Sequence, residues 1–194
     1  MIYIKECLLR IISKIFDTQH KNSGLDNRDL KYTLRNDPEK TDCDKVRDIL
    51  IRTGFFSDEE VIVAIELIEE KLSIGEKSTY KFIFAESGGA MLGYTCFGHI
   101  PLTKESYDLY WIAVDPSKQG YGIGRLLLEK SEDMIRELGG VHAYAETASR
   151  KQYTPTRRFY SSCGYKKAAY FPDFYTPGDG KVVYYKKLQS LQKM

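Results

Sequence analysis

Several residue patterns that mark other classes of protein are missing from this sequence of 194 residues. Its 4 cysteines lie far apart, without a C-x-x-C pair, and its 3 histidines are not paired. This placement argues against a zinc site or a disulfide framework and favours free thiols in a reducing compartment, the cytoplasm. We therefore expect no metal cofactor.

Charge and hydropathy exclude two further classes. The formal net charge is +2 and no basic face stands out, so we expect no nucleic-acid partner. No apolar run is long enough to span a bilayer. The 42% hydrophobic content is ordinary for a soluble globular domain with its own core.

Residues 1–29 differ from the rest of the chain. Apolar residues recur at near-helical spacing between Ile2 and Phe16, interrupted by basic residues, and the pattern lacks the uninterrupted apolar core of a signal peptide. Such a helix can lie on a membrane, but we favour docking on its own domain or on a second subunit of a homodimer. Polar residues 17–29 are expected to link it to a domain over residues 30–194.

From residue 30 onward, strand and helix patterns predict an α/β (α+β mixed) fold with one mixed sheet. Strands are expected at 30–35, 80–86, 90–98, 108–114, 141–146, 165–171 and 181–188, and helices at 42–52, 58–72 and 124–138, with a short one after Thr154. Ser57 and Glu60 predict a capping box for the second helix. Leu72 and Leu138 are expected to face inward, and Thr154 is expected to be an N-cap.

A glycine-rich loop lies between a buried strand and a helix, with the sequence Gln119-Gly120-Tyr121-Gly122-Ile123-Gly124-Arg125. Glycines at alternate positions remove side chains where backbone N–H groups must face outward together, and a helix N-terminus attracts anions. Arg125 can add a charge-assisted contact. The loop therefore predicts a diphosphate site.

Two alternatives to that interpretation are weaker. A dinucleotide-binding oxidoreductase would carry G-x-G-x-x-G in its first βαβ unit, whereas the spacing here is G-x-G-x-G and the motif comes late. A merely structural turn would not need three spaced glycines at the start of a helix.

The loop closely resembles motif A of the GNAT superfamily of N-acetyltransferases, Q/R-x-x-G-x-G/A, with Gln119, Gly122 and Gly124 at its fixed positions. Residues 110–116 look like the fourth strand of that family with its bulge, and residues 158–165 resemble its second signature, a helix ending in F/L-Y-x-x-x-G-F/Y. The resemblance covers about residues 30–188. It implies a central mixed, splayed sheet of about six to seven strands flanked by helices.

The resemblance also implies a reaction. Acetyl-CoA would be the co-substrate, and a small-molecule or peptide amine would attack its thioester directly in a ternary complex. The acetyl group would lie beside Ala113 and Val114, with the Val114 N–H as oxyanion donor. Tyr160 would meet the leaving thiolate as the acid. Many members carry asparagine where this chain has Tyr153, so no asparagine contact is carried over.

The general base is less defined. Glu146 ends a strand beside the cofactor strand and is our candidate, but an ion pair with Arg150, Arg157 or Arg158 is an equally good interpretation. Asp173, in the last hairpin loop, is the reserve.

Other titratable and aromatic residues have plainer expected roles. His99 and His142 are expected at the surface, and His20 lies in the linker. Asp58 and Glu59 are expected to cap a helix, and Tyr107, Tyr110 and Trp111 are candidates for a wall of the acceptor site, with alternate ones in the core. A non-catalytic module that binds acyl-CoA in a complex remains the alternative function.

Overall fold

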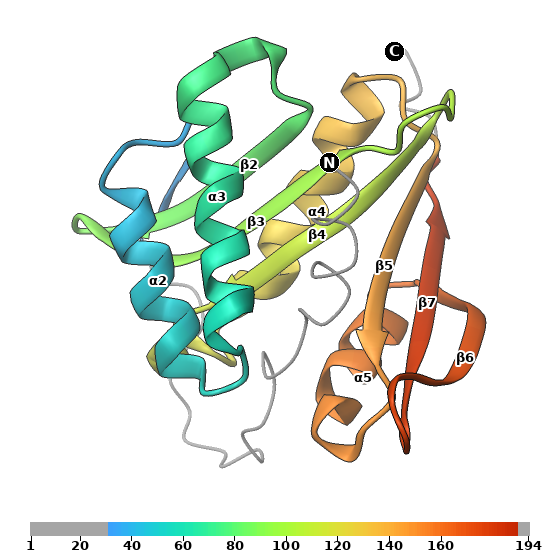
Figure 1. Cartoon of the computed structure of the whole chain (residues 1–194). Coiled ribbons are helices and arrows are strands. Elements are labelled where there is room, and N and C mark those ends of the chain that lie inside the picture. Colours follow the sequence, from blue (N-terminus) through green and yellow to red (C-terminus); the bar gives the residue numbers. More distant parts are fainter. Residues whose placement is uncertain (1–30, 190–194) are drawn as a thin grey trace.

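The computed structural model describes residues 31–189, which form a seven-stranded sheet in the order β1-β2-β3-β4-β5-β7-β6 (Figure 1). Neighbouring strands are antiparallel except β4 and β5, which are parallel. The strands are β1 (Thr33–Arg35), β2 (Tyr80–Ser87), β3 (Ala90–His99), β4 (Ser106–Val114), β5 (His142–Ala148), β6 (Lys166–Thr176) and β7 (Asp179–Lys187), and the α-helices are α2 (Asp42–Thr53), α3 (Asp58–Ile74), α4 (Ile123–Glu137) and α5 (Thr154–Ser162). The predicted mixed fold and strand number are confirmed.

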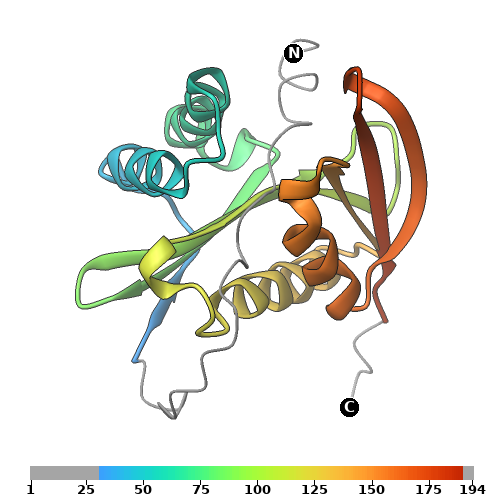
Figure 2. The same cartoon turned by 90° about the horizontal axis from the view of Figure 1, so that it is seen from below.

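The helices cover both faces of the sheet in two pairs (Figure 2). α2 and α3 pack over β2–β4 through an apolar cluster that includes Val46 and Trp111. α4 and α5 pack on the opposite face through a second cluster that includes Leu127 and Val182. The sheet is therefore buried on both sides at its centre.

Local sequence explains where α2 and α3 begin and end. Gly54 ends α2 in the left-handed conformation, with φ of 68°. The Ser57 hydroxyl accepts a hydrogen bond from the Glu60 N–H at 3.3 Å, and the Glu60 carboxylate accepts one from the Ser57 N–H at 2.8 Å. The predicted capping box is confirmed.

Three sequence predictions at helix ends are wrong. Leu72 and Leu138 are 36% and 48% exposed rather than buried, because fewer neighbouring elements cover a side chain near a helix end. Thr154 is the first residue of α5 rather than its N-cap, since a 3₁₀ turn over Lys151–Tyr153 leads directly into the helix.

A β-bulge in β4 decides the shape of the sheet. Leu109 and Trp111 pair with consecutive residues of β3, which leaves Tyr110 without an opposite residue on that strand. One inserted residue reverses the alternation, so that Leu109 and Ile112 face the same side, toward α4 and α5. The pairing of β4 with β5 ends at the same point, where Leu109 lies opposite Ala145. Beyond it the two strands diverge (Figure 1).

The expected N-terminal helix and linker, and with them His20, lie outside the described residues. Between residues 31 and 189, no helix is long and apolar enough to cross a membrane. In the same range, no group of three or more His, Cys, Asp or Glu side chains is arranged to hold a metal ion. Cys43, Cys96 and Cys163 are free thiols, as predicted.

The capping box generates a prediction about stability. Replacing Ser57 by Ala removes the acceptor for the Glu60 N–H and should lower the free energy of unfolding by about 1 kcal/mol. Urea denaturation measures this, with Ser73→Ala, an exposed change in the same helix, as a control that stays within about 0.5 kcal/mol. Equal midpoints for the two variants would contradict a capping role.

Candidate active site

The gap between β4 and β5 exposes backbone hydrogen-bonding groups. The Asp115 N–H donates to the Leu92 carbonyl on β3 at 2.8 Å. Because successive N–H groups of a strand point to opposite sides, the Val114 N–H points away from β3 and toward the gap. β5 does not pair with this part of β4. The Val114 N–H can therefore donate to a ligand that enters between the strands.

A glycine on β3 holds β4 in this position. Gly93 lies opposite Val114, and a Cβ at Gly93 would come within 2.6 Å of the Ala113 carbonyl oxygen. The close approach fixes Ala113 and Val114 against β3, so the gap opens on the β5 side.

The glycine loop follows β4 directly. Gly120 and Gly122 have φ of 84° and 82°, and no atom lies within 4 Å of an added Cβ, so backbone conformation rather than space requires glycine there. Gly122 is the N-cap of α4, whose first N–H groups have no acceptor within the helix. Tyr121 is 44% exposed, and Arg125 is exposed and donates to the Ser162 hydroxyl at 3.4 Å. The loop has the form of an anion site.

Tyr160 lies on α5 and is fully buried. Its ring packs against Tyr165 and Tyr184, with centroids 5.4 and 5.7 Å away. Among the described residues, its hydroxyl has no hydrogen-bond partner, and the same holds for Thr156 one turn earlier. Burial raises the pKa of the Tyr160 phenol well above its ordinary value, so this hydroxyl is protonated at neutral pH and can act as a donor.

Glu146 lies on β5 and forms an ion pair, but with a partner that the sequence analysis did not consider. The Lys181 ammonium on β7 lies 3.2 and 3.3 Å from its two carboxylate oxygens. Lys181 also lies over the ring of Phe174, 4.3 Å from the centroid. The prediction of Arg150, Arg157 or Arg158 as the partner of Glu146 is therefore wrong. Arg150 forms an ion pair with Asp179 instead. Lys181 lies close to Glu146 because β5 pairs with β7.

Glu146 also lines a recess of about 290 Å³ on the sheet. The recess is walled by residues of the β3–β4 loop, β4, β5 and β7: Ile100, Thr103, Ser106, Asp108, Tyr144, Glu146 and Val183. Asp108 and Tyr144 lie opposite each other across the β4–β5 ladder, so this recess begins where the two strands still pair. It offers two carboxylates and several hydroxyl groups to a polar ligand.

Most of the other candidates have structural roles. Asp173 lies within β6 rather than in the last hairpin loop, because this strand continues beyond residue 171 to Thr176. Its carboxylate accepts a hydrogen bond from the Gly178 N–H at 2.7 Å, which stabilises the turn between β6 and β7. His99 ends β3 with its Nε2 3.3 Å from the Lys104 carbonyl. Trp111 and Tyr107 are 1% and 7% exposed and belong to the core on opposite faces.

The remaining candidates lie nearer the surface. Tyr110 is partly buried and packs edge-on against Tyr80, and His142 is partly exposed at the start of β5. Asp58 and Glu59 lie in the first turn of α3, as a capping role requires. None of these positions contradicts its expected role.

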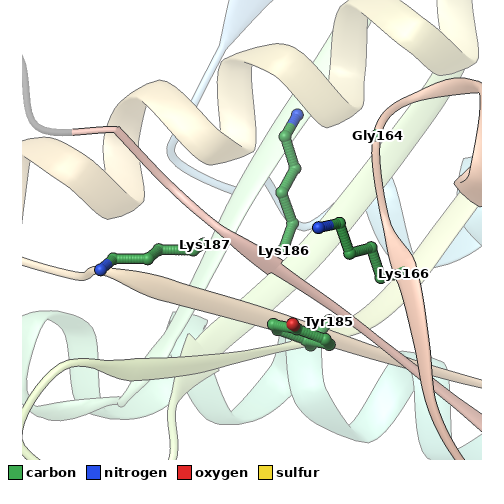
Figure 3. Close-up of a pocket in the computed structure, with 5 residues that line it drawn as sticks. All are labelled: Gly164, Lys166, Tyr185, Lys186 and Lys187. Carbon is green, nitrogen blue, oxygen red and sulfur yellow. The ribbon is translucent and has the colours of Figure 1, made fainter.

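A second recess, of about 180 Å³, lies beside β7 (Figure 3). It is lined by Gly164, Lys166, Tyr185, Lys186 and Lys187. Lys186 points toward the neighbouring helix in Figure 3, and its ammonium binds the Glu132 carboxylate of α4 at 2.7 and 2.8 Å. This ion pair ties β7 to α4, so we assign the recess no part in the chemistry.

Two residues near the site were not found from the sequence. Lys181 could have been found only by knowing that β5 pairs with β7 rather than with β6. Thr156 lies on the same face of α5 as Tyr160, four residues earlier, and that spacing was visible. Its burial was not.

Comparison with known proteins identifies the family to which the chain belongs. Residues 44–165 match the model of the acetyltransferase (GNAT) family. The chain is 36% identical over 87 residues to the N-alpha-acetyltransferase RimI of Mycobacterium tuberculosis (strain ATCC 25618 / H37Rv). That match covers 44% of this chain and 52% of RimI, so it spans about half the length of that curated relative.

Solved structures agree with the family match. A protein from Desulfovibrio desulfuricans described as a GNAT-family acetyltransferase is 40% identical, with a TM-score of 0.81 over 82% of this chain and 100% of that one. An aminoglycoside 6'-N-acetyltransferase complexed with coenzyme A shares the fold at 16% identity, with a TM-score of 0.67 over 84% and 100% of the two chains. The chain belongs to the acetyltransferase (GNAT) family. The predicted family and fold are confirmed, and the alternative of a dinucleotide-binding oxidoreductase is set aside.

The glycine loop generates a prediction about ligand binding. Gly122→Ala places a side chain at φ of 82°, which costs about 1–2 kcal/mol in the loop, and should weaken coenzyme A binding about 5- to 20-fold by calorimetry. Gly139→Ala is the matched control, because Gly139 has φ of 83° and equal space but follows the other end of α4.

The control variant should lose stability and keep its affinity for coenzyme A within about 2-fold. Equal losses of affinity in the two variants would show that strain anywhere in the fold, rather than in this loop, weakens binding.

Proposed function

We propose that the chain transfers the acetyl group of acetyl-CoA to a primary amine by direct attack in a ternary complex. The observation that carries the proposal is the gap between β4 and β5, toward which the Val114 N–H points and from which the chain leads into the glycine loop. A backbone donor in such a gap suits the oxyanion of a tetrahedral intermediate.

The residues present fit the coenzyme. The N–H groups of residues 120–125 at the start of α4, with the open space beside Gly120 and Gly122, suit a diphosphate. Gln119 and Arg125 flank this loop, and the backbone of Ala113 and Val114 would hold the acyl end. When bound, acetyl-CoA supplies the activated thioester.

Tyr160 is the proposed acid. Its hydroxyl is buried in the same cluster as Val114, and it has no partner among the described residues. A buried donor without a partner is costly, and a ligand atom can satisfy it. The raised pKa favours a hydrogen bond to the developing thiolate over early release of the proton.

Glu146 is the proposed base. An alkyl amine with a pKa near 10.4 is mostly protonated at neutral pH, so a carboxylate that removes a proton, directly or through a water, increases the reactive fraction. Lys181 contacts both carboxylate oxygens, and each oxygen has a further lone pair that can accept a hydrogen bond from the incoming amine.

The acceptor is proposed to be an amine that is cationic at neutral pH, on a small molecule or a peptide N-terminus. The names of RimI and of the aminoglycoside acetyltransferase refer to two such classes of amine. In this chain, Asp108 and Glu146 place two carboxylates on the recess beside the gap. They favour a cation over an anion.

A second candidate function is a module that binds acyl-CoA without catalysis. One observation favours it, namely that Lys181 occupies both oxygens of the proposed base. Coenzyme A binding without thiol release over a broad panel of amines would support this alternative.

Tyr160→Phe tests the proposed acid. Removing the hydroxyl while keeping the ring should slow amine-dependent thiol release by about 10²-fold and leave coenzyme A affinity within about 2-fold. Tyr165→Phe is the control, since it removes another buried phenol hydroxyl from the same cluster. Unchanged turnover in Tyr160→Phe would show that the acid assignment is wrong.

Glu146→Gln tests the base through its pH dependence. At pH 7 the acceptor is protonated and needs a base, so kcat/KM should fall about 10²-fold; the difference should shrink as the pH approaches 10.4, where the free amine forms unaided. Asp173→Asn, which keeps an oxygen for the Gly178 N–H, should leave the pH–rate profile unchanged. A loss in Glu146→Gln that is the same at every pH would indicate that Glu146 serves as an ion-pair partner of Lys181 and not as a base.

A further inference from the structure

Arg52, in the last turn of α2, contacts the segment that precedes the glycine loop. Its guanidinium donates to both carboxylate oxygens of Asp115, at 3.1 and 2.7 Å, across 63 positions of sequence. Its Nε donates to Asp48 at 2.8 Å, one turn earlier on the same helix. A bidentate contact with a third hydrogen bond behind it fixes the plane of the guanidinium, as a lysine could not do.

Asp115 in turn determines the turn between β4 and the glycine loop. Its carboxylate accepts hydrogen bonds from the Ser117 N–H and the Ser117 hydroxyl, both at 2.8 Å. Its carbonyl accepts one from the Lys118 N–H at 2.8 Å, and its own N–H is bonded to Leu92 on β3. Asp115 therefore makes four hydrogen bonds that fix the turn leading to Gln119, the first residue of the loop.

The charges of this pair are partly shielded from water. The Asp115 side chain is 13% exposed and that of Arg52 is 42% exposed. Partial burial alone would raise the pKa of Asp115, but the hydrogen bonds from Arg52 and Ser117 outweigh it and leave the pKa below its ordinary value. Asp115 is therefore ionised at neutral pH, and the contact with Arg52 is charge-assisted.

We propose that Arg52 is a positioning residue for the coenzyme site and that it acts through Asp115. Gly120 and Gly122 leave the loop with much conformational freedom. An anchor at the first residue after β4 reduces the entropy that diphosphate binding must remove. Through Arg52, helix α2 on one face of the sheet stabilises the N-terminal end of α4 on the other. The inference rests on the proposed function, because it requires coenzyme binding at this loop.

Coenzyme A binding to an Arg52→Ala variant tests this inference by calorimetry, with Arg47→Ala as the matched control. Arg47 lies on the same helix and pairs with Asp44 at 2.9 Å, both exposed. We expect Arg52→Ala to weaken binding about 5- to 30-fold, as loss of a hydrogen-bonded charge pair would, and Arg47→Ala to change it less than about 2-fold. At saturating acetyl-CoA, Arg52→Ala should keep kcat within about 2-fold, so the loss appears in the KM for acetyl-CoA.

Two further variants separate positioning from general destabilisation. Asp115→Asn keeps an oxygen for Ser117 but removes the charge that Arg52 binds, so adding Arg52→Ala to it should cost less than about 2-fold more. Arg52→Lys keeps a charge without the bidentate geometry and should bind with intermediate affinity. Unchanged affinity in Arg52→Ala, or losses that multiply in the double variant, would overturn the inference. Failure of the unaltered chain to bind coenzyme A would overturn the proposed function itself.

Discussion

The divergence of β4 from β5 beyond Leu109 is the constraint on which the rest of the site depends. A bulge at Tyr110 turns β4 away from β5 and reverses its alternation. Gly93 lets β3 hold the far half of β4 closely, so the strand keeps one partner while it loses the other. The result is a strand end whose backbone can bind a ligand and from which the chain passes directly into the glycine loop.

The two side chains proposed for acid and base catalysis, Tyr160 and Glu146, differ in how tightly their surroundings fix them. Tyr160 packs against the rings of Tyr165 and Tyr184, and its hydroxyl has no hydrogen-bond partner among the described residues. Glu146 contacts Lys181, which also lies over the ring of Phe174 on β6. The proposed acid is therefore fixed by packing, whereas the proposed base is held by one flexible lysine side chain.

Features that depend on neighbouring residues in sequence were predictable. The capping box, the left-handed Gly54 and the glycine loop follow from local backbone chemistry, and so does the order of strands and helices. Contacts between distant segments were not predictable: the Lys181 partner of Glu146 and the Arg52 contact with Asp115 depend on which strands and helices lie side by side. The predictions that Leu72 and Leu138 are buried at helix ends were wrong for a related reason, because the exposure of a side chain depends on what packs against it.

A crystal structure of the chain with acetyl-CoA would test the central claim most directly. We predict the diphosphate on the N–H groups of residues 120–125, the acetyl carbonyl on the Val114 N–H, and the sulfur within hydrogen-bonding distance of the Tyr160 hydroxyl. A coenzyme bound outside the gap between β4 and β5, or a sulfur that Tyr160 cannot reach, would contradict it.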